Sequence, residues 1–96
     1  MSLDELASKY IDSAERVFTN LAVSLDSFSL NVESVRKVVL CARDYLEDAR
    51  YYRDKKKFEV SLTSVAYCEG LLDALKMLGA VSFEWPRKAK EKRSKK

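Results

Sequence analysis

The sequence contains no histidine, and this absence removes several classes of enzyme at the outset. Ser-His-Asp and Cys-His nucleophilic catalysis, histidine general-base chemistry and histidine-ligated zinc all need that side chain. The chain also lacks a Gly-rich phosphate loop, a nucleophile elbow and a familiar spacing of metal ligands. We therefore expect a protein that is not an enzyme and that holds no metal or cofactor.

Glycine and proline are scarce as well, with two and one in 96 residues. So few turn formers argue against an all-β fold, which needs many short turns. Hydrophobic residues make up 47% of the chain and charged residues 34%, as in a soluble globular protein rather than a disordered one. The length has room for one small domain, which we expect to be all-α.

Long apolar runs are missing too. The first twenty residues alternate charged and apolar positions, so we expect neither a signal peptide nor a membrane span, and we predict a cytoplasmic protein. Cys41 and Cys68 form no CxxC motif and lie within apolar patterns. We interpret them as buried thiols, with a disulfide between them as the alternative.

What the sequence does contain is helical periodicity over three segments, residues 3–24, 32–54 and 58–78. A capping box, Ser2 followed by Glu5, opens the first segment. Its apolar residues recur at alternating spacings of four and three, and further ones widen the stripe enough to contact two neighbouring helices. The regular positions are Leu3, Ala7, Tyr10, Ala14, Val17 and Leu21.

The second segment carries an apolar side from Val35 to Tyr52, with Ser29 or Asn31 as the predicted N-cap. The third segment is apolar almost all round, which predicts a central helix covered on both sides. Gly79 is placed to end it in a left-handed turn. Gly70, in the middle of this helix, is interpreted as a point where another backbone, such as that of the first helix, approaches closely.

Short connections between three such helices predict an antiparallel, up-down three-helix bundle over residues 1–86. After Gly79, Val81, Phe83 and Trp85 alternate with polar residues. We expect a short extended segment that folds back on the bundle and ends at Pro86. Residues 87–96 form a separate basic tail.

The stretch ARDYLEDARYYRDKKKFEVSLTSVAYCEGLLDALKMLG resembles the archaeal domain-of-unknown-function family numbered 357. That family pairs a tyrosine-rich helix containing aspartate with a helix carrying a Tyr-x-Glu-Gly-Leu-Leu-Asp-Ala-Leu run, here starting at Tyr67. The chain departs from the family at the turn, where it has Asp54 and three lysines. The resemblance implies a small three-helix protein without an established activity.

Carboxylates and phenols lie on the second and third predicted helices, and they would form a cluster if those faces met. Paired carboxylates can bind a divalent cation or shift each other's pKa. The alternatives are a solvated stripe in which Asp73 pairs with Lys76, or tyrosine–carboxylate hydrogen bonds that fix the helix register. The candidate cluster consists of Tyr45, Asp48, Tyr52, Tyr67, Glu69 and Asp73.

Positive charge is concentrated at the C-terminal end. Residues 87–96 hold seven of the 18 basic residues and one acidic residue, which leaves 11 basic and 14 acidic residues in the body. Such a tail can neutralise phosphates of nucleic acid, contact an acidic protein or membrane surface, or serve only as a solvated, disordered terminus. The candidate anion contacts are Arg53, Lys55, Lys56, Lys57, Arg87, Lys88, Lys90, Lys92, Arg93, Lys95 and Lys96.

These features favour a non-enzymatic protein-interaction or scaffold module, whose partner is a second copy of the chain or another protein. The alternative is a nucleic-acid-binding accessory protein that uses the basic tail.

Overall fold

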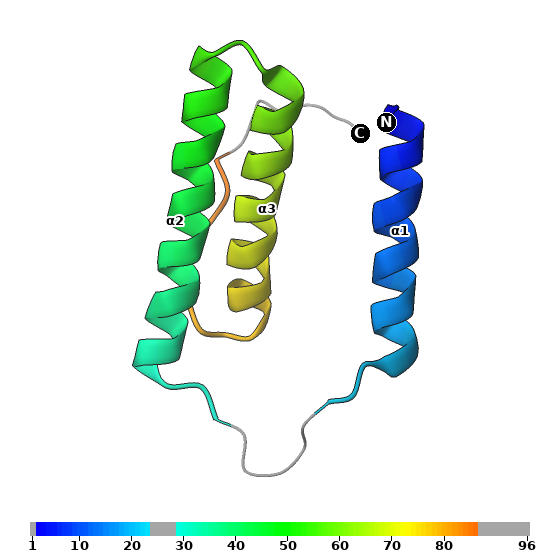
Figure 1. The fold of residues 1–96 in the computed structure, drawn as a ribbon. Coiled ribbons are helices and arrows are strands. Elements are labelled where there is room, and N and C mark those ends of the chain that lie inside the picture. Colours follow the sequence, from blue (N-terminus) through cyan, green and yellow to red (C-terminus); the bar gives the residue numbers. More distant parts are fainter. Residues whose placement is uncertain (1, 24–28, 87–96) are drawn as a thin grey trace.

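The computed structural model describes residues 2–23 and 29–86, and within them it contains three α-helices and no strand. The helices are α1 (Leu3–Asn20), α2 (Val32–Asp54) and α3 (Phe58–Met77), drawn in Figure 1. The all-α class is confirmed, and each helix begins at the predicted residue. In this described part, no helix has the length and apolar character that a membrane crossing requires.

The start of α1 is a capping box, as the sequence predicts. The Ser2 hydroxyl accepts a hydrogen bond from the Glu5 backbone N–H at 3.2 Å, and the Glu5 carboxylate accepts one from the Ser2 backbone N–H at 2.9 Å. Because Ser2 donates to the charged carboxylate, the pKa of Glu5 lies below its ordinary value. The helix ends earlier than predicted, because Leu21 takes an extended conformation.

Helices α2 and α3 form a hairpin and pack closely on each other. Tyr45 stacks on Tyr67, and Ala49 accepts a hydrogen bond from Ser61, so later residues of α2 meet earlier residues of α3. The two helices of the hairpin are therefore antiparallel (Figure 1).

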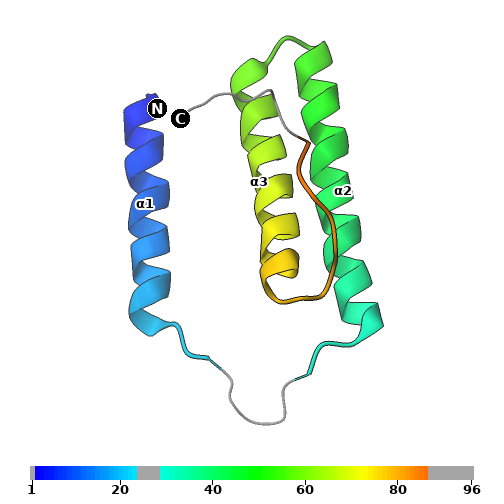
Figure 2. The same cartoon turned by 180° about the vertical axis from the view of Figure 1, so that it is seen from behind.

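Helix α1 differs from its expected place in the bundle. It makes no residue contacts with α2 or α3, and none of its residues is buried. Figures 1 and 2 show it beside the hairpin as a separate rod. The apolar stripe that predicts packing is present on α1, but in this structure it contacts no other helix.

Small side chains fill the interface between α2 and α3. The buried residues are Ala42, Ala49, Cys68 and Leu75, which are 1% to 6% exposed. Where Ala49 lies, the Ser61 hydroxyl donates a hydrogen bond to its carbonyl oxygen at 2.7 Å. Alanine and serine leave room for the two backbones to approach. Among residues 2–23 and 29–86, Leu75 is the one large side chain in this core, and none is completely buried.

Two expectations for α3 are wrong in the described structure. The helix is not covered all round, because Leu62 is 67% exposed and Met77 is 82% exposed. Gly70 is not a point of close approach either, since a Cβ atom placed there would meet nothing within 4 Å. Both differences arise because, among the described helices, only α2 packs against α3.

The hairpin helices end in the same type of turn. After α3, Gly79 has a φ of 77°, and the backbone N–H groups of Gly79 and Ala80 donate to the carbonyls of Lys76 and Leu75. This is a Schellman motif with glycine in the left-handed position, as predicted.

After α2 the same hydrogen bonds recur, with Lys56 and Lys57 donating to Arg53 and Tyr52. Here the left-handed position belongs to Lys56, at a φ of 63°. The turn thus reaches its geometry without the glycine that usually supports it.

Candidate interaction surface

One side of the hairpin is covered by the segment that follows α3. The Trp85 indole N–H donates a hydrogen bond to the Asp73 carboxylate at 2.8 Å, and the Phe83 and Trp85 rings meet edge to face at 4.9 Å. The Lys76 ammonium lies 4.9 Å from the centre of the Phe83 ring and 3.9 Å from the Glu84 carboxylate. Figure 2 shows this segment lying along the hairpin, so the predicted fold-back is confirmed.

The opposite side of the hairpin is open. Its centre is the stack of Tyr45 on Tyr67, whose ring centres are 4.3 Å apart with the planes inclined by 12°. Tyr67 is 54% exposed, and Val60 and Leu78, which lie on the same side of α3 at helical spacing, are 44% and 62% exposed. We call this surface the tyrosine face; it comprises Val38, Cys41, Tyr45, Val60, Ser64, Tyr67, Leu71, Ala74 and Leu78.

The tyrosine stack changes the acidity of one phenol. The pKa of Tyr45 is raised above its ordinary value, chiefly because a negative charge on Tyr45 would be repelled by a negative charge on the neighbouring Tyr67, and also because the phenol is partly desolvated. The Tyr45 phenol is therefore neutral near neutral pH and can act as a hydrogen-bond donor.

The candidate polar cluster is only partly assembled. The structure brings Tyr45 and Tyr67 together, whereas Glu69 and Asp73 lie on the other side of α3, beside Trp85. Asp73 bonds to Trp85 rather than pairing with Lys76. Among the described residues, no group of three metal-ligating side chains lies close enough together to hold an ion.

The two remaining members of that cluster lie on α2. Asp48 is exposed, and the Tyr52 ring meets the Tyr51 ring edge to face at 5.1 Å. Neither contacts the carboxylates of α3 in a way that would complete a shared site.

The basic candidates fall into two groups. Arg53 bonds to Asp54 at 3.2 Å, and Lys55 lies 5.4 Å from the centre of the Tyr51 ring, while Lys56 and Lys57 are exposed beside them. These residues give the turn between α2 and α3 a positive end. The tail candidates from Arg87 to Lys96 lie outside the described residues.

The two cysteines differ in exposure, and both are free. Cys68 is buried as predicted, and burial raises the pKa of its thiol. The prediction that Cys41 is buried is wrong: it lies one turn before Tyr45 and is exposed, because that side of α2 has no helix against it.

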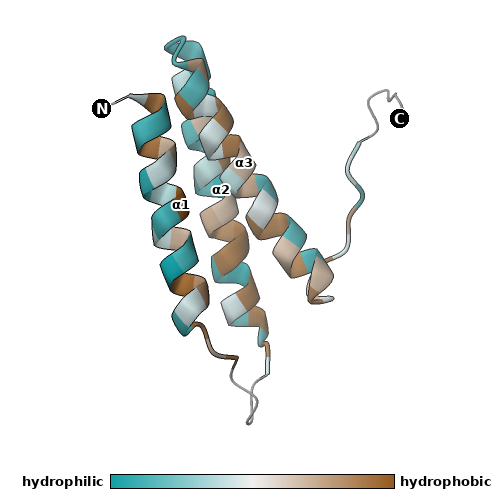
Figure 3. Ribbon diagram, turned by 90° about the vertical axis from the view of Figure 1, so that its right-hand side faces the viewer, coloured by the Kyte–Doolittle hydropathy of each residue, from teal (hydrophilic) through white to brown (hydrophobic). Residues whose placement is uncertain are grey.

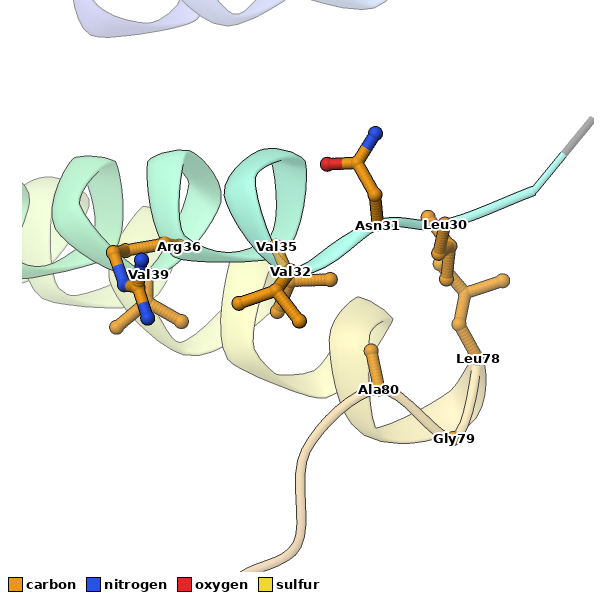
Figure 4. A pocket seen from close by; sticks show the side chains of 9 residues that line it. All are labelled: Leu30, Asn31, Val32, Val35, Arg36, Val39, Leu78, Gly79 and Ala80. Atoms are coloured by element: carbon orange, nitrogen blue, oxygen red, sulfur yellow. The ribbon is translucent and has the colours of Figure 1, made fainter.

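A cavity of about 540 Å³ lies at the end of the hairpin where α2 begins and α3 ends. Leu30, Val35, Val39 and Leu78 supply its apolar lining, with Asn31 and Arg36 at the edge (Figure 4). Asn31 also caps α2 by accepting a hydrogen bond from the Ser34 backbone N–H at 2.8 Å. The signal for this cavity in the sequence is Leu30, an apolar residue in the connection that precedes α2.

Helix α1 presents a second apolar surface. Leu3, Tyr10 and Val17 are each more than half exposed, and so are Ile11, Phe18 and Leu21. The acidic and basic residues of α1 lie on its other side at helical spacing, so the helix is amphipathic along its length. We call this surface the α1 stripe; it comprises Leu3, Ala7, Tyr10, Ala14, Val17 and Leu21 together with the flanking Ile11 and Phe18.

Comparison with known proteins confirms the family resemblance. The family described as protein of unknown function (DUF357) matches residues 5–81, which is most of the chain and includes all three helices nearly complete. No curated protein and no solved structure matches the chain significantly.

Proposed function

The chain belongs to the DUF357 family, and on the evidence of its own surfaces we propose that it is a non-enzymatic protein-interaction module. The observation that carries the proposal is the pair of exposed apolar surfaces, the α1 stripe and the tyrosine face. Contiguous apolar surface of this kind marks sites of protein interaction more often than free surface.

The chemistry of the tyrosine face supports a protein partner. Tyr45 and Tyr67 offer flat apolar rings with hydroxyl groups at their edges, and tyrosine is enriched at the centres of protein interfaces. The face runs lengthwise along two helices, which is the shape that an amphipathic helix of a partner can occupy. The absence of histidine from the sequence supports the non-enzymatic part of the proposal.

Affinity capture from the lysate of the native host tests this function, with nuclease added to remove bridging nucleic acid. The test variant is Tyr67→Asp, which places a charge on the tyrosine face. The matched control is Leu62→Asp, because Leu62 is also an exposed apolar residue of α3 but lies on another side. We expect proteins captured by the wild type and by Leu62→Asp to be lost with Tyr67→Asp; equal capture by both variants contradicts the proposal.

A second candidate function rests on the charge of residues 87–96, which hold seven basic residues and one acidic residue. A protein that neutralises several phosphates binds nucleic acid without sequence preference and loses affinity steeply with salt. Filter binding to RNA and DNA over a salt series tests this role. Removal of residues 87–96 should abolish binding if the tail carries it, whereas Tyr67→Asp should leave binding unchanged.

A further inference from the structure

We propose that the tyrosine face is a helix-binding groove whose resident occupant is α1 of the same chain, so that a partner helix has to displace α1 to bind. This inference rests on the proposed function, because it names what regulates access to the same surface.

The apolar residues of α1 and of the tyrosine face follow the same spacing. On α1, the stripe recurs at intervals of four and three from Leu3 to Leu21. On α3, the tyrosine face recurs at the same intervals through Val60, Ser64, Tyr67, Leu71, Ala74 and Leu78. Helices with this repeat pack lengthwise, and each of these stretches is about 27 Å long at 1.5 Å per residue.

Charge favours one direction for α1 in the groove. Its first turn carries Asp4 and Glu5, and the turn between α2 and α3 carries Lys55 to Lys57. Figure 1 shows the N-terminal end of α1 at the same end of the molecule as that turn. Docking in this direction places opposite charges together and makes α1 antiparallel to α2.

Helix α1 already lies on the correct side of the hairpin. In Figure 3 it is on one side of α2 and α3, and the segment after α3 is on the other. That segment bonds to Asp73 and covers the side away from Tyr67, so it leaves the groove open. Closure therefore needs only that α1 approach the hairpin, without passing around it.

The connection between Asn20 and Val32 tethers α1 to the hairpin, which favours α1 over other helices as the occupant of the tyrosine face. About eleven residues span at most roughly 40 Å, which keeps α1 within reach and gives it an effective concentration of about 1 mM at the groove. A second copy of the chain, or a helix of another protein, is present at micromolar concentration and is therefore at a disadvantage against the millimolar effective concentration of α1.

Cross-linking in the full-length chain tests the proposal. Cys41 is exposed on the tyrosine face and Cys68 is buried, so Ala14→Cys adds one accessible thiol on the α1 stripe. A short bis-maleimide should then join residue 14 to Cys41 within one chain. The matched control is Asp12→Cys, on the polar side of the same helix. At the effective concentration that the tether gives, we expect about tenfold more intramolecular product with Ala14→Cys than with Asp12→Cys.

Mass spectrometry of the products decides between the occupants. A cross-linked monomer specific to Ala14→Cys supports the proposal. Equal yields from both variants overturn it, and so do cross-linked dimers at low micromolar protein, which would make a second copy the occupant. If the monomer forms but lysate capture is insensitive to Tyr67→Asp, the proposed function fails and the groove assignment stands. If capture depends on Tyr67 while no specific cross-link forms, only the α1 assignment fails.

Discussion

The indole of Trp85 donates a hydrogen bond to the carboxylate of Asp73 at 2.8 Å, and this contact joins the segment after Gly79 to α3. Residues 12 apart in the sequence are thereby connected without any regular secondary structure between Gly79 and Trp85. The contact also decides which side of the hairpin is covered and which side is open.

Asp73→Ala should release that segment. Because the acceptor is charged but exposed, we expect a loss of about 1 kcal/mol in the free energy of unfolding. Trp85 is the only tryptophan, so its fluorescence reports directly on the contact and should shift to longer wavelength. Glu69→Ala, which removes a carboxylate on the same side of α3 that does not bond to the indole, should leave the emission unchanged. An unaltered spectrum in Asp73→Ala would refute the assignment.

Lys56→Gly should stabilise the hairpin. Lys56 has a φ of 63°, which costs about 1 kcal/mol or more for a residue with a Cβ and nothing comparable for glycine. We expect a gain of about 1 kcal/mol in urea denaturation. Lys55→Gly is the control, because Lys55 has a φ of −87° and gains nothing from glycine. Destabilisation by Lys56→Gly would show that the lysine side chain itself supports the turn.

The two glycines should respond in opposite ways to alanine. Gly70 lies inside α3 with open space around a Cβ, so Gly70→Ala should stabilise the protein by about 1 kcal/mol through helix propensity. Gly79 has a φ of 77°, so Gly79→Ala should destabilise it by about 1 kcal/mol. Thermal unfolding of both variants checks the pair, and a lower melting temperature for Gly70→Ala would contradict the first half.

Alkaline pH should weaken the fold through Tyr45. Its pKa is raised in the folded protein, so the unfolded chain loses the phenolic proton first as the pH rises. The stabilisation of the neutral phenol is present below the unfolded pKa of 10.0 and is lost as the pH passes through the higher folded pKa. Urea midpoints of the wild type should therefore fall above pH 10 more than those of Tyr45→Phe. Parallel curves for the two proteins would exclude Tyr45 as the cause.

The cysteines should differ in reactivity. Cys41 is exposed, whereas Cys68 is buried and the pKa of its thiol is raised. Since the thiolate is the reactive form, a thiol reagent at neutral pH should modify Cys41 first and Cys68 only after the hairpin opens. Peptide mapping of the labelled chain identifies the order. Modification of both residues at the same rate would mean that the interface around Cys68 opens readily.

Local signals in the sequence predicted the helices well. Ser2 with Glu5 marks the start of α1, Asn31 marks the start of α2, and Gly79 marks the end of α3. Each signal works through hydrogen bonds or backbone angles within a few residues, and such interactions do not depend on what the rest of the chain does.

Longer-range features were harder to predict. The apolar periodicity of α1 predicts an apolar face on this helix, but it does not predict which surface that face packs against. For the same reason the exposure of Cys41 was missed, because a residue on an amphipathic helix is buried only if another element lies against it. The turn between α2 and α3 lies where the sequence predicts it, but the left-handed backbone of Lys56 was not predicted, because the sequence gives no glycine there. The partly assembled polar cluster depended on the rotation of α3, which small residues at the interface determine.

The close packing of α2 on α3 has a consequence for how the chain folds. The residues that meet are joined by one tight turn, so this pair can form while little of the chain has been ordered and can do so rapidly. The docking of α1 against the α2–α3 hairpin is then a later and separable step, with its own equilibrium. Evolution can tune that equilibrium by changes upstream of Leu30 without endangering the part that folds first.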